Sequence, residues 1–252
     1  MIGIVGGSGF YAFLDSHVEG LSETEVVTPY GPPSAPVSVG RVGDRQVAFL
    51  ARHGLDHRFP PHRVNYRANL WALREVGSTA VLGSFAAGSL QPRIHPGELV
   101  VCDQLVDRTW GRPDTYFDGP DVQHLPFADP YDEGLRRVLT EAGRSTGATV
   151  HGSGTVVVIG GPRFATRAES RWYRAQGWDV IGMTQYPEAA LAAELELPYA
   201  AVALVTDYDT GLEGVDGIEA VTQEQVFAVM AANVERVRAL FRAAIPLVPV
   251  QE

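Results

Sequence analysis

The sequence predicts a single-domain α/β fold in which a central, mixed and twisted β-sheet is flanked by helices. The length of 252 residues is one that α/β folds often reach as one unit. A content of 45% hydrophobic and 20% charged residues is typical of a folded chain with a large core. Short apolar runs alternate with helical patterns along the chain, which indicates a mixed or parallel sheet covered by helices on both faces.

The buried strands are predicted from apolar runs that end at Gly, Pro or Asp. In order, these runs are residues 2–5, 37–42, 47–51, 80–82, 99–102, 155–159, 180–181 and 199–206.

The covering helices are predicted from apolar residues at helical spacing, such as Leu70 and Leu73. A proline at position 187 suits a first helical turn, and Thr222 is a candidate N-cap. The predicted helices are residues 64–76, 133–144, 187–196 and 223–244, and a further helix is expected to start after the turn at 161–164.

Two segments rich in Pro and Gly, residues 29–36 and 108–126, are expected to leave the sheet. The second is long for a structureless loop and is expected to contact a ligand or another subunit. Without an internal repeat, low-complexity tract or linker, residues 1–252 are predicted to form one domain.

Charge and cysteine content narrow the class of protein. A net charge of −10 argues against a nucleic-acid binder, which needs a basic face. No stretch approaches the roughly 20 apolar residues that span a bilayer, so no membrane is expected. Cys102 is alone, which excludes an intrachain disulfide and a metal–thiolate cluster and suits a reducing cytoplasm. The N-terminus is interpreted as a first strand rather than a signal peptide, because it lacks a basic segment.

Several strand ends carry residues suited to an anion. Ser8 lies in a glycine loop after the first strand, where backbone N–H groups can turn toward a ligand. Arg52 and His53 follow the strand at 47–51 and offer further donors. Residues 84–89 are interpreted as a glycine-rich turn after the strand at 80–82. Since open α/β sheets bind ligands at the carboxyl ends of strands, these segments together favour a phosphate site, although each alone fits a plain turn or a solvated charge.

A second group of residues suits a flat base. Asp207 and Asp209 follow an apolar strand, where partial burial raises a carboxyl pKa toward general-acid use. Phe164, at a strand-to-helix turn, could stack on a base or belong to the core. Arg167 and Glu169 are interpreted as a structural ion pair.

Taken together, these segments resemble the 5′-methylthioadenosine phosphorylases, within the trimeric branch of the purine nucleoside phosphorylases. The resemblance runs through nearly the whole chain. It is carried by residues 3–9, 51–54, 64–73, 103–109, 161–164, 167–170, 183–184, 187–188 and 206–209.

The resemblance implies phosphorolysis: phosphate attacks C1′ of a nucleoside and releases the purine. It also implies a homotrimer that binds a nucleoside and phosphate and needs no metal or organic cofactor. Asp207 would be the catalytic acid. The phosphate residues would be Ser8, Arg52, His53, Phe85, Ala86 and Thr184. The nucleoside residues would be Ala87, Gly88, Phe164, Gly182, Met183, Asp207, Asp209, Gln223 and, from a neighbouring subunit, His124.

The chain departs from the family pattern at Phe85, where a small, often hydroxylated residue is usual. Gly160 stands where Glu is common, and Gly182 where Asn is frequent. Ala165 and Asp207 match relatives that act on 6-aminopurines. Gln223 falls where relatives specific for methylthio groups often have an apolar residue, which leaves the 5′ substituent open.

Methylthioadenosine phosphorolysis is therefore the leading hypothesis. Phosphorolysis of adenosine or another 5′-modified 6-aminopurine nucleoside is the second. A nucleoside-binding homologue with weakened phosphate use is the third, motivated by Phe85 and Gly160. A dinucleotide-dependent dehydrogenase is discarded, because the opening glycines lack the rest of that fingerprint.

Overall fold

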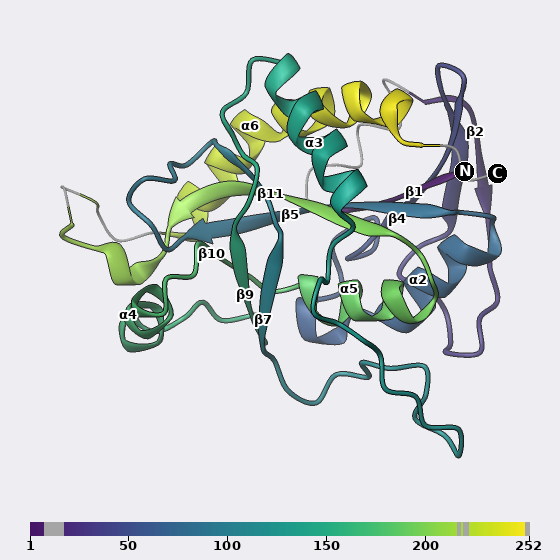
Figure 1. Cartoon of the computed structure of the whole chain (residues 1–252), viewed down its shortest axis with the longest axis horizontal. Coiled ribbons are helices and arrows are strands. Elements are labelled where there is room, and N and C mark those ends of the chain that lie inside the picture. Colours follow the sequence, from purple (N-terminus) through teal and green to yellow (C-terminus); the bar gives the residue numbers. More distant parts are fainter. Residues whose placement is uncertain (8–17, 216–217, 219–221, 250–252) are drawn as a thin grey trace.

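The computed structural model describes residues 1–7, 18–215, 218 and 222–249. Over these residues the molecule is built around one sheet of 11 strands with helices on both sides (Figure 1), which confirms the predicted fold class. The strands are β1 (Ile2–Gly6), β2 (Glu19–Thr24), β3 (Val37–Val42), β4 (Arg45–Ala51), β5 (Ala80–Ser89), β6 (Leu99–Val101), β7 (Gln104–Arg108), β8 (Val150–His151), β9 (Thr155–Ile159), β10 (Val180–Gly182) and β11 (Tyr199–Tyr208). The helices are α2 (Tyr66–Glu75), α3 (Glu133–Ser145), α4 (Arg167–Ala175), α5 (Gln185–Glu194) and α6 (Gln223–Ala244), with 3-10 turns at Pro61–Arg63, Thr210–Leu212 and Ile245–Leu247.

The centre of the sheet is parallel. β1 pairs in parallel with β4 and β5, and β11 pairs in parallel with β5. β10 joins β5 in the antiparallel direction, so the sheet is mixed. The carboxyl ends of β1, β4, β5 and β11 therefore meet at one edge, which is where open α/β sheets place ligands.

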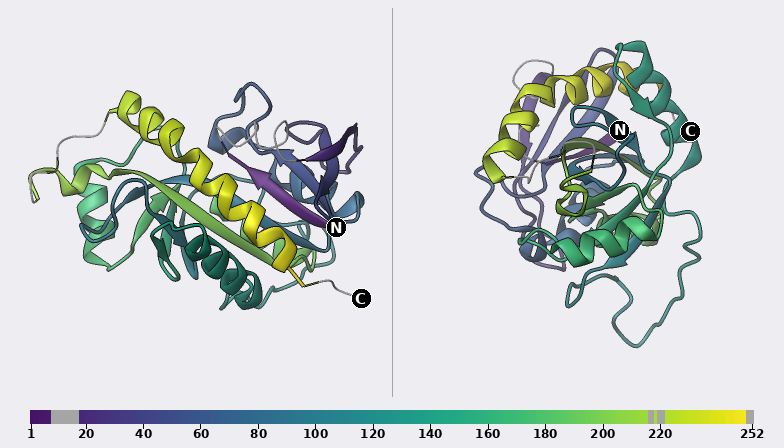
Figure 2. Two further views of the ribbon diagram at one scale, coloured as in Figure 1. Left: turned by 90° about the horizontal axis from the view of Figure 1, so that it is seen from above. Right: turned by 90° about the vertical axis from the view of Figure 1, so that its left-hand side faces the viewer.

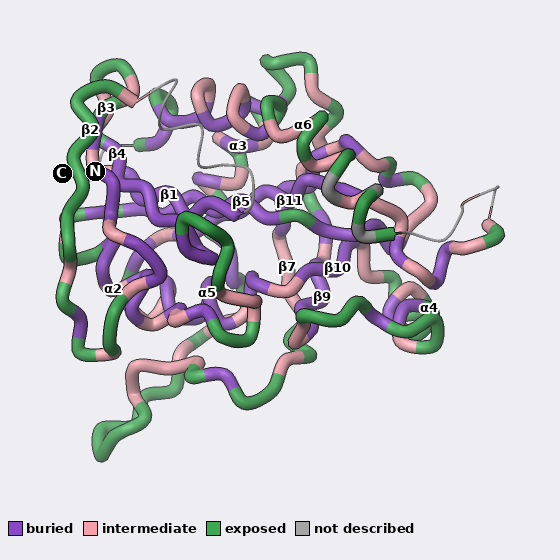
Figure 3. Tube along the Cα trace, turned by 180° about the vertical axis from the view of Figure 1, so that it is seen from behind, coloured by how far each residue is buried: buried purple, intermediate pink, exposed green. Residues whose placement is uncertain are grey.

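Two cores lie on opposite faces of this sheet. Along β1 the side chains alternate, so Ile4 packs with Leu240 and Phe241 of α6, whereas Val5 faces the cluster that contains Leu191 of α5. Helices α3 and α6 cover the first face, with α6 lying across it, and α2 and α5 cover the second (Figures 1 and 2). The strands between them are buried while the connecting segments are mostly exposed (Figure 3). Burying each such Leu or Phe contributes about 1.5–3 kcal/mol.

The interpretation of residues 84–89 as a turn is wrong, because β5 runs on through them to Ser89. The small residues are explained by neighbours on β11. A Cβ at Gly83 would overlap the Tyr199 hydroxyl, and one at Gly88 would lie 3.1 Å from Asp207 Oδ2. These glycines admit close side chains and do not end the strand.

The other predicted strands and helices are present, and their ends differ from the predicted ones by at most a few residues. The helix beginning at Pro187 is confirmed, since Tyr186 has extended φ and ψ and regular helix starts after it. Strands β2, β7 and β8 were not predicted; β2 is exposed along its length and lacks an apolar pattern. No helix in the described part of the chain is long and apolar enough to cross a bilayer.

Candidate active site

A cavity opens at the carboxyl edge of the central strands. Its empty volume, counting the open mouth, is about 810 Å³. It is lined by Gly7, Arg52, His53, His57, Pro61, Phe85, Ala86, Ala87, Gly88, Ile159, Phe164, Ala165, Ile181, Gly182, Met183, Thr184, Thr206, Asp207, Asp209 and Val226.

Thr184, which directly precedes α5, lines the cavity. Thr184 is the N-cap residue of this helix, yet its hydroxyl does not cap the backbone. The Oγ1 atom is buried and has no hydrogen-bond partner among the described residues. A buried polar group without a partner is costly. Thr184 therefore offers an unused hydroxyl to a ligand in the cavity.

Arg52 also lines the cavity, and its guanidinium group donates hydrogen bonds to other residues of the protein. Nε donates to Glu188 Oε2 at 2.6 Å and Nη2 donates to Glu188 Oε1 at 2.7 Å, while Nη1 donates to the Ser84 carbonyl at 2.8 Å. Burial opposes the charged form, but Glu188 outweighs it and raises the Arg52 pKa. Two of the three guanidinium nitrogens of Arg52 are therefore turned to the buried Glu188, a pairing that the sequence did not predict.

His53 also differs from its sequence interpretation as a second donor. Nδ1 lies 2.9 Å from the Phe59 carbonyl oxygen, which can only accept, so Nδ1 carries the proton. Burial and the nearby Arg52 charge lower the His53 pKa to about 3. The ring is consequently neutral at pH 7, and its Nε2 atom can accept a hydrogen bond but cannot donate one.

Two carboxyl groups also line the cavity. Asp207 is within β11, where Thr206 Oγ1 donates to its Oδ1 atom at 2.7 Å. Burial raises the Asp207 pKa against this hydrogen bond. For Asp209, burial and the Asp207 charge raise the pKa to about 6 although Ser170 opposes them, and its Oδ2 atom is buried with no partner among the described residues. Both carboxyls therefore keep a proton more readily than an exposed Asp does, as groups that transfer protons in active sites often do.

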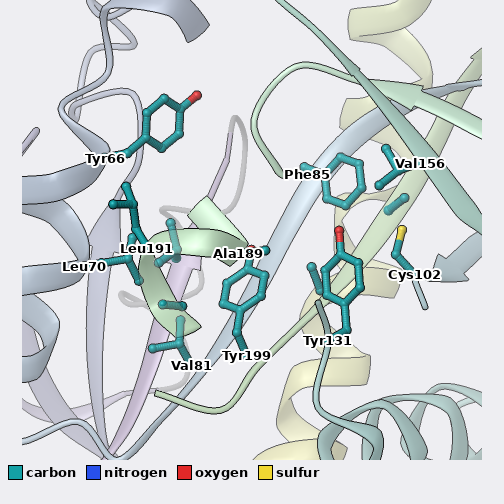
Figure 4. Close-up of a cluster of buried hydrophobic side chains, with 14 of the residues drawn as sticks. Tyr66, Leu70, Val81, Phe85, Cys102, Tyr131, Val156, Ala189, Leu191 and Tyr199 are labelled. Carbon is teal, nitrogen blue, oxygen red and sulfur yellow. The ribbon is translucent and has the colours of Figure 1, made fainter. Parts of the chain in front are cut away.

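The other walls of the cavity are largely apolar. Phe164 is 44% exposed, so its ring is available to a ligand and does not belong to the core. Gly161 has a φ of +60°, and a Cβ there would lie 2.6 Å from the Met183 sulfur. Phe85 belongs to the core cluster and lies beside Val156 (Figure 4), with its ring close to Gly182.

The cavity brings together most of the predicted site residues. Ser8 lies outside the described residues, as does the side chain of Gln223. His124 is exposed and does not line the cavity of its own chain. The predicted ion pair between Arg167 and Glu169 is wrong: Arg167 pairs with Glu213, and Glu169 pairs with Arg163.

Sequence reasoning missed Glu188 as the partner of Arg52. The two residues are 136 positions apart, and the only signal was that Glu188 falls in one of the segments that resemble the family. It also missed Thr206 and His57 as lining residues. Within the described residues, no group of three or more His, Cys, Asp or Glu side chains is arranged to hold a metal ion.

Comparison with known proteins shows the family to which the chain belongs. The sequence model of the Phosphorylase superfamily matches residues 1–246. The S-methyl-5′-thioadenosine phosphorylase of Mycolicibacterium smegmatis is 54% identical, covering 100% of this chain and 92% of that protein. The purine nucleoside phosphorylase of Streptomyces coelicolor is 53% identical, covering 98% of this chain and 89% of that protein.

A solved structure is similar over the same extent. Methylthioadenosine phosphorylase from Schistosoma mansoni in complex with adenine has a TM-score of 0.92 and 38% identity, covering 100% of this chain and 92% of that chain. With the family match over nearly its whole length and relatives above half identity, this chain belongs to the phosphorylase superfamily.

Proposed function

We propose that the protein catalyses phosphorolysis of S-methyl-5′-thioadenosine to adenine and 5-methylthioribose 1-phosphate. The observation that carries the proposal is one cavity lined both by the unpartnered Thr184 hydroxyl and by two carboxyls of raised pKa, Asp207 and Asp209. The names of the Mycolicibacterium and Schistosoma relatives support the same reaction.

In the proposed reaction a phosphate oxygen bonds to C1′ of the ribose as the C1′–N9 bond breaks. The electron pair of that bond passes to the purine, and Asp207 donates a proton to the purine N7. Phosphate stabilises the positive charge that develops on the sugar. Inorganic phosphate is a co-substrate, and no metal or organic cofactor is needed, because the reaction involves no hydride, radical or electron transfer.

The proposed site residues are assigned to two substrates, phosphate and the nucleoside. Phosphate would be held by Ser8, Arg52, His53, Ala86 and Thr184, with Phe85 at the adjoining wall. Because His53 Nε2 only accepts, it suits a protonated phosphate oxygen. The nucleoside would contact Ala87, Gly88, Phe164, Gly182, Met183, Asp207, Asp209 and Gln223.

Phosphorolysis of adenosine or another 5′-modified 6-aminopurine nucleoside is the second candidate. It is favoured by the Streptomyces relative, which is named a purine nucleoside phosphorylase, and by the polar Gln223. Hydrophobic pockets discriminate small 5′ substituents only modestly, so the two substrates must be compared directly.

The test is adenine release from methylthioadenosine and from adenosine, each with and without phosphate. Release is expected only with phosphate and faster from methylthioadenosine, and Asp207→Asn should lower kcat by about 10²–10⁴-fold because it cannot donate the proton. Asp44→Asn, at the exposed turn between β3 and β4, is the control. A faster reaction with adenosine would favour the second candidate, and release that does not depend on phosphate would contradict both.

We further infer a homotrimer in the cytoplasm. The segment around His124 supports the assembly, since His124 is exposed and does not line the cavity of its own chain. The single cysteine suits a reducing compartment.

A further inference from the structure

Glu188 is a fully buried carboxylate with every oxygen in use. Both of its oxygens accept from Arg52, at 2.6 and 2.7 Å, and the Tyr199 hydroxyl donates to Oε1 at 2.6 Å. Arg52 and Glu188 are each 0% exposed. Such a bidentate pair is strong and fixes orientation as well as charge.

This pairing decides which part of Arg52 reaches the cavity. Nε and Nη2 are turned toward Glu188, so Nη1 is the remaining nitrogen. Nη1 donates one hydrogen to the Ser84 carbonyl and lies beside Gly7, whose Cβ position would be 3.3 Å away. Gly7 and Arg52 both line the cavity, so Nη1 is the Arg52 nitrogen beside that wall, and the guanidinium offers no free fork there.

The pairing also removes net charge from this part of the cavity. The positive Arg52 is matched by the negative Glu188, and His53 is neutral. Attraction for an anion is therefore left to directed N–H and O–H groups such as the unpartnered Thr184 hydroxyl. Position, rather than net charge, is what Arg52 contributes.

Surrounding residues keep Glu188 itself in place. Tyr199 reaches it from β11 across Gly83, where the absence of a side chain admits the hydroxyl. Gln185 Oε1 lies 3.2 Å from the Tyr131 hydroxyl and 3.3 Å from the Tyr199 hydroxyl, in the same buried group. Tyr131 and Tyr199 belong to the buried core cluster shown in Figure 4.

We propose that Glu188 is a positioning residue for the reaction: it holds Arg52 so that a single Nη1 edge meets the phosphate in line with the reacting sugar. The inference rests on the proposed function in taking phosphate as the ligand. Glu188 touches neither substrate, and its effect passes through Arg52.

The test is Glu188→Gln, measured by initial rates at varied phosphate and varied nucleoside. Removing the carboxylate leaves Arg52 charged but no longer fixed, and misplacement of about 1 Å near reacting groups costs about 10²-fold in rate. We therefore expect kcat to fall by about that factor while KM for nucleoside is unchanged. KM for phosphate should stay equal or fall, because a negative charge near the anion is lost.

If Glu188 had only a structural role, its loss would not lower kcat while leaving both KM values without a rise. Glu235→Gln is the matched control, since Glu235 forms an exposed ion pair with Arg242 on α6 and does not line the cavity. Unchanged kcat in Glu188→Gln, or a rise in both KM values, would overturn the proposal. If this variant does not fold, Glu188→Asp keeps the charge but shortens the reach, and Tyr199→Phe removes one support. Both should lower kcat with no rise in KM for phosphate.

Thermal unfolding with added inorganic phosphate separates this inference from the proposed function. Phosphate should raise Tm of the wild type, and of Glu188→Gln by at least as much. If phosphate stabilises both proteins but no nucleoside is cleaved, the proposed function fails and the link between Glu188 and phosphate stands. If phosphate raises Tm of neither protein, Arg52 is not at a phosphate site and the inference is wrong.

Discussion

Asp207 and Asp209 illustrate how single residues acquire their properties from burial. The Asp209 carboxyl has its pKa raised from 3.8 to about 6, chiefly by burial, so its ionised form is disfavoured in the folded state. At pH values below the unfolded pKa, the group is protonated in both states and has no effect. Between that pKa and about 6 the unfolded state ionises first, so the free energy of unfolding falls as pH rises. The loss is complete above about pH 6, and a tenfold difference in proton affinity between the two states corresponds to about 1.4 kcal/mol.

Asp209→Asn is therefore expected to stabilise the protein at pH 8 and to change its stability much less at pH 4. The measurement is the free energy of unfolding by urea at both values. Asp56→Asn serves as the control, because Asp56 is exposed and its pKa is lowered by a hydrogen bond from Arg58. Equal effects of Asp209→Asn at the two pH values would show that the raised pKa is not what limits stability.

Single residues also mark the limit of what the sequence predicts. Arg52, Thr184 and Asp207 could be placed at the cavity because each follows a recognisable strand or begins a helix. Their hydrogen-bond states could not be predicted. The hydrogen bonds of Arg52 depend on Glu188, and those of His53 depend on the Phe59 carbonyl. Tertiary packing brings these partners together.

At the scale of elements, the packing of β10 against β5 explains two departures from the family pattern. A Cβ at Gly182 would lie 3.0 Å from Phe85 Cε2, so the ring takes the space that a side chain at 182 would need. The two positions are therefore coupled: the large residue on β5 requires the absence of a side chain on β10.

Gly182→Ala is expected to destabilise the wild type by about 1–3 kcal/mol, as overpacking does. In a Phe85→Ala background, which alone should lose about 3–5 kcal/mol, the same substitution should cost almost nothing. Unfolding in denaturant of the four proteins in this cycle measures the coupling. Gly160→Ala is a matched control, because its Cβ would make an ordinary 3.9 Å contact with Trp110. Equal losses in both backgrounds would contradict the coupling.

Strands and helices were predicted correctly where the local apolar pattern matches the burial of the element in the fold. The buried strands β3 and β9 and the helix α6 were predicted with the bounds that the structure has. The second half of β5 was wrongly predicted as a turn. Gly88 leaves room for the Asp207 side chain on β11, and the local sequence does not reveal this contact. The helix start after Phe164 was predicted, and Thr166 and Glu169 form its capping box.

At the scale of the whole molecule, an arm leaves the body between β7 and α3. We define the arm as residues 109–130, and Figure 1 shows it extending beyond α5. Its base is fixed, since the Thr115 hydroxyl and the Tyr116 N–H donate to Glu194. Farther along, His124 and Val122 are exposed, and Trp110 is 86% exposed. Apolar residues held at the surface by an anchored base suit contact with a second copy of the chain.

The proposed trimer makes a prediction that involves two subunits at once. If His124 completes a neighbour's nucleoside pocket, His124→Ala should raise KM for nucleoside and leave KM for phosphate unchanged. Native mass should be near three times 27.2 kDa.

Subunit mixing tests the shared site directly. Asp207→Asn lacks the acid but has an intact arm, whereas His124→Ala has the acid but a defective arm. After exchange of equal amounts, about a quarter of the sites should combine an intact Asp207 with a neighbour's intact His124, if each site draws on one neighbour. At low nucleoside concentration the mixture should then exceed the mean of the two separate variants. Activity equal to that mean would place His124 outside the neighbour's site, and a monomeric mass would exclude the shared site altogether.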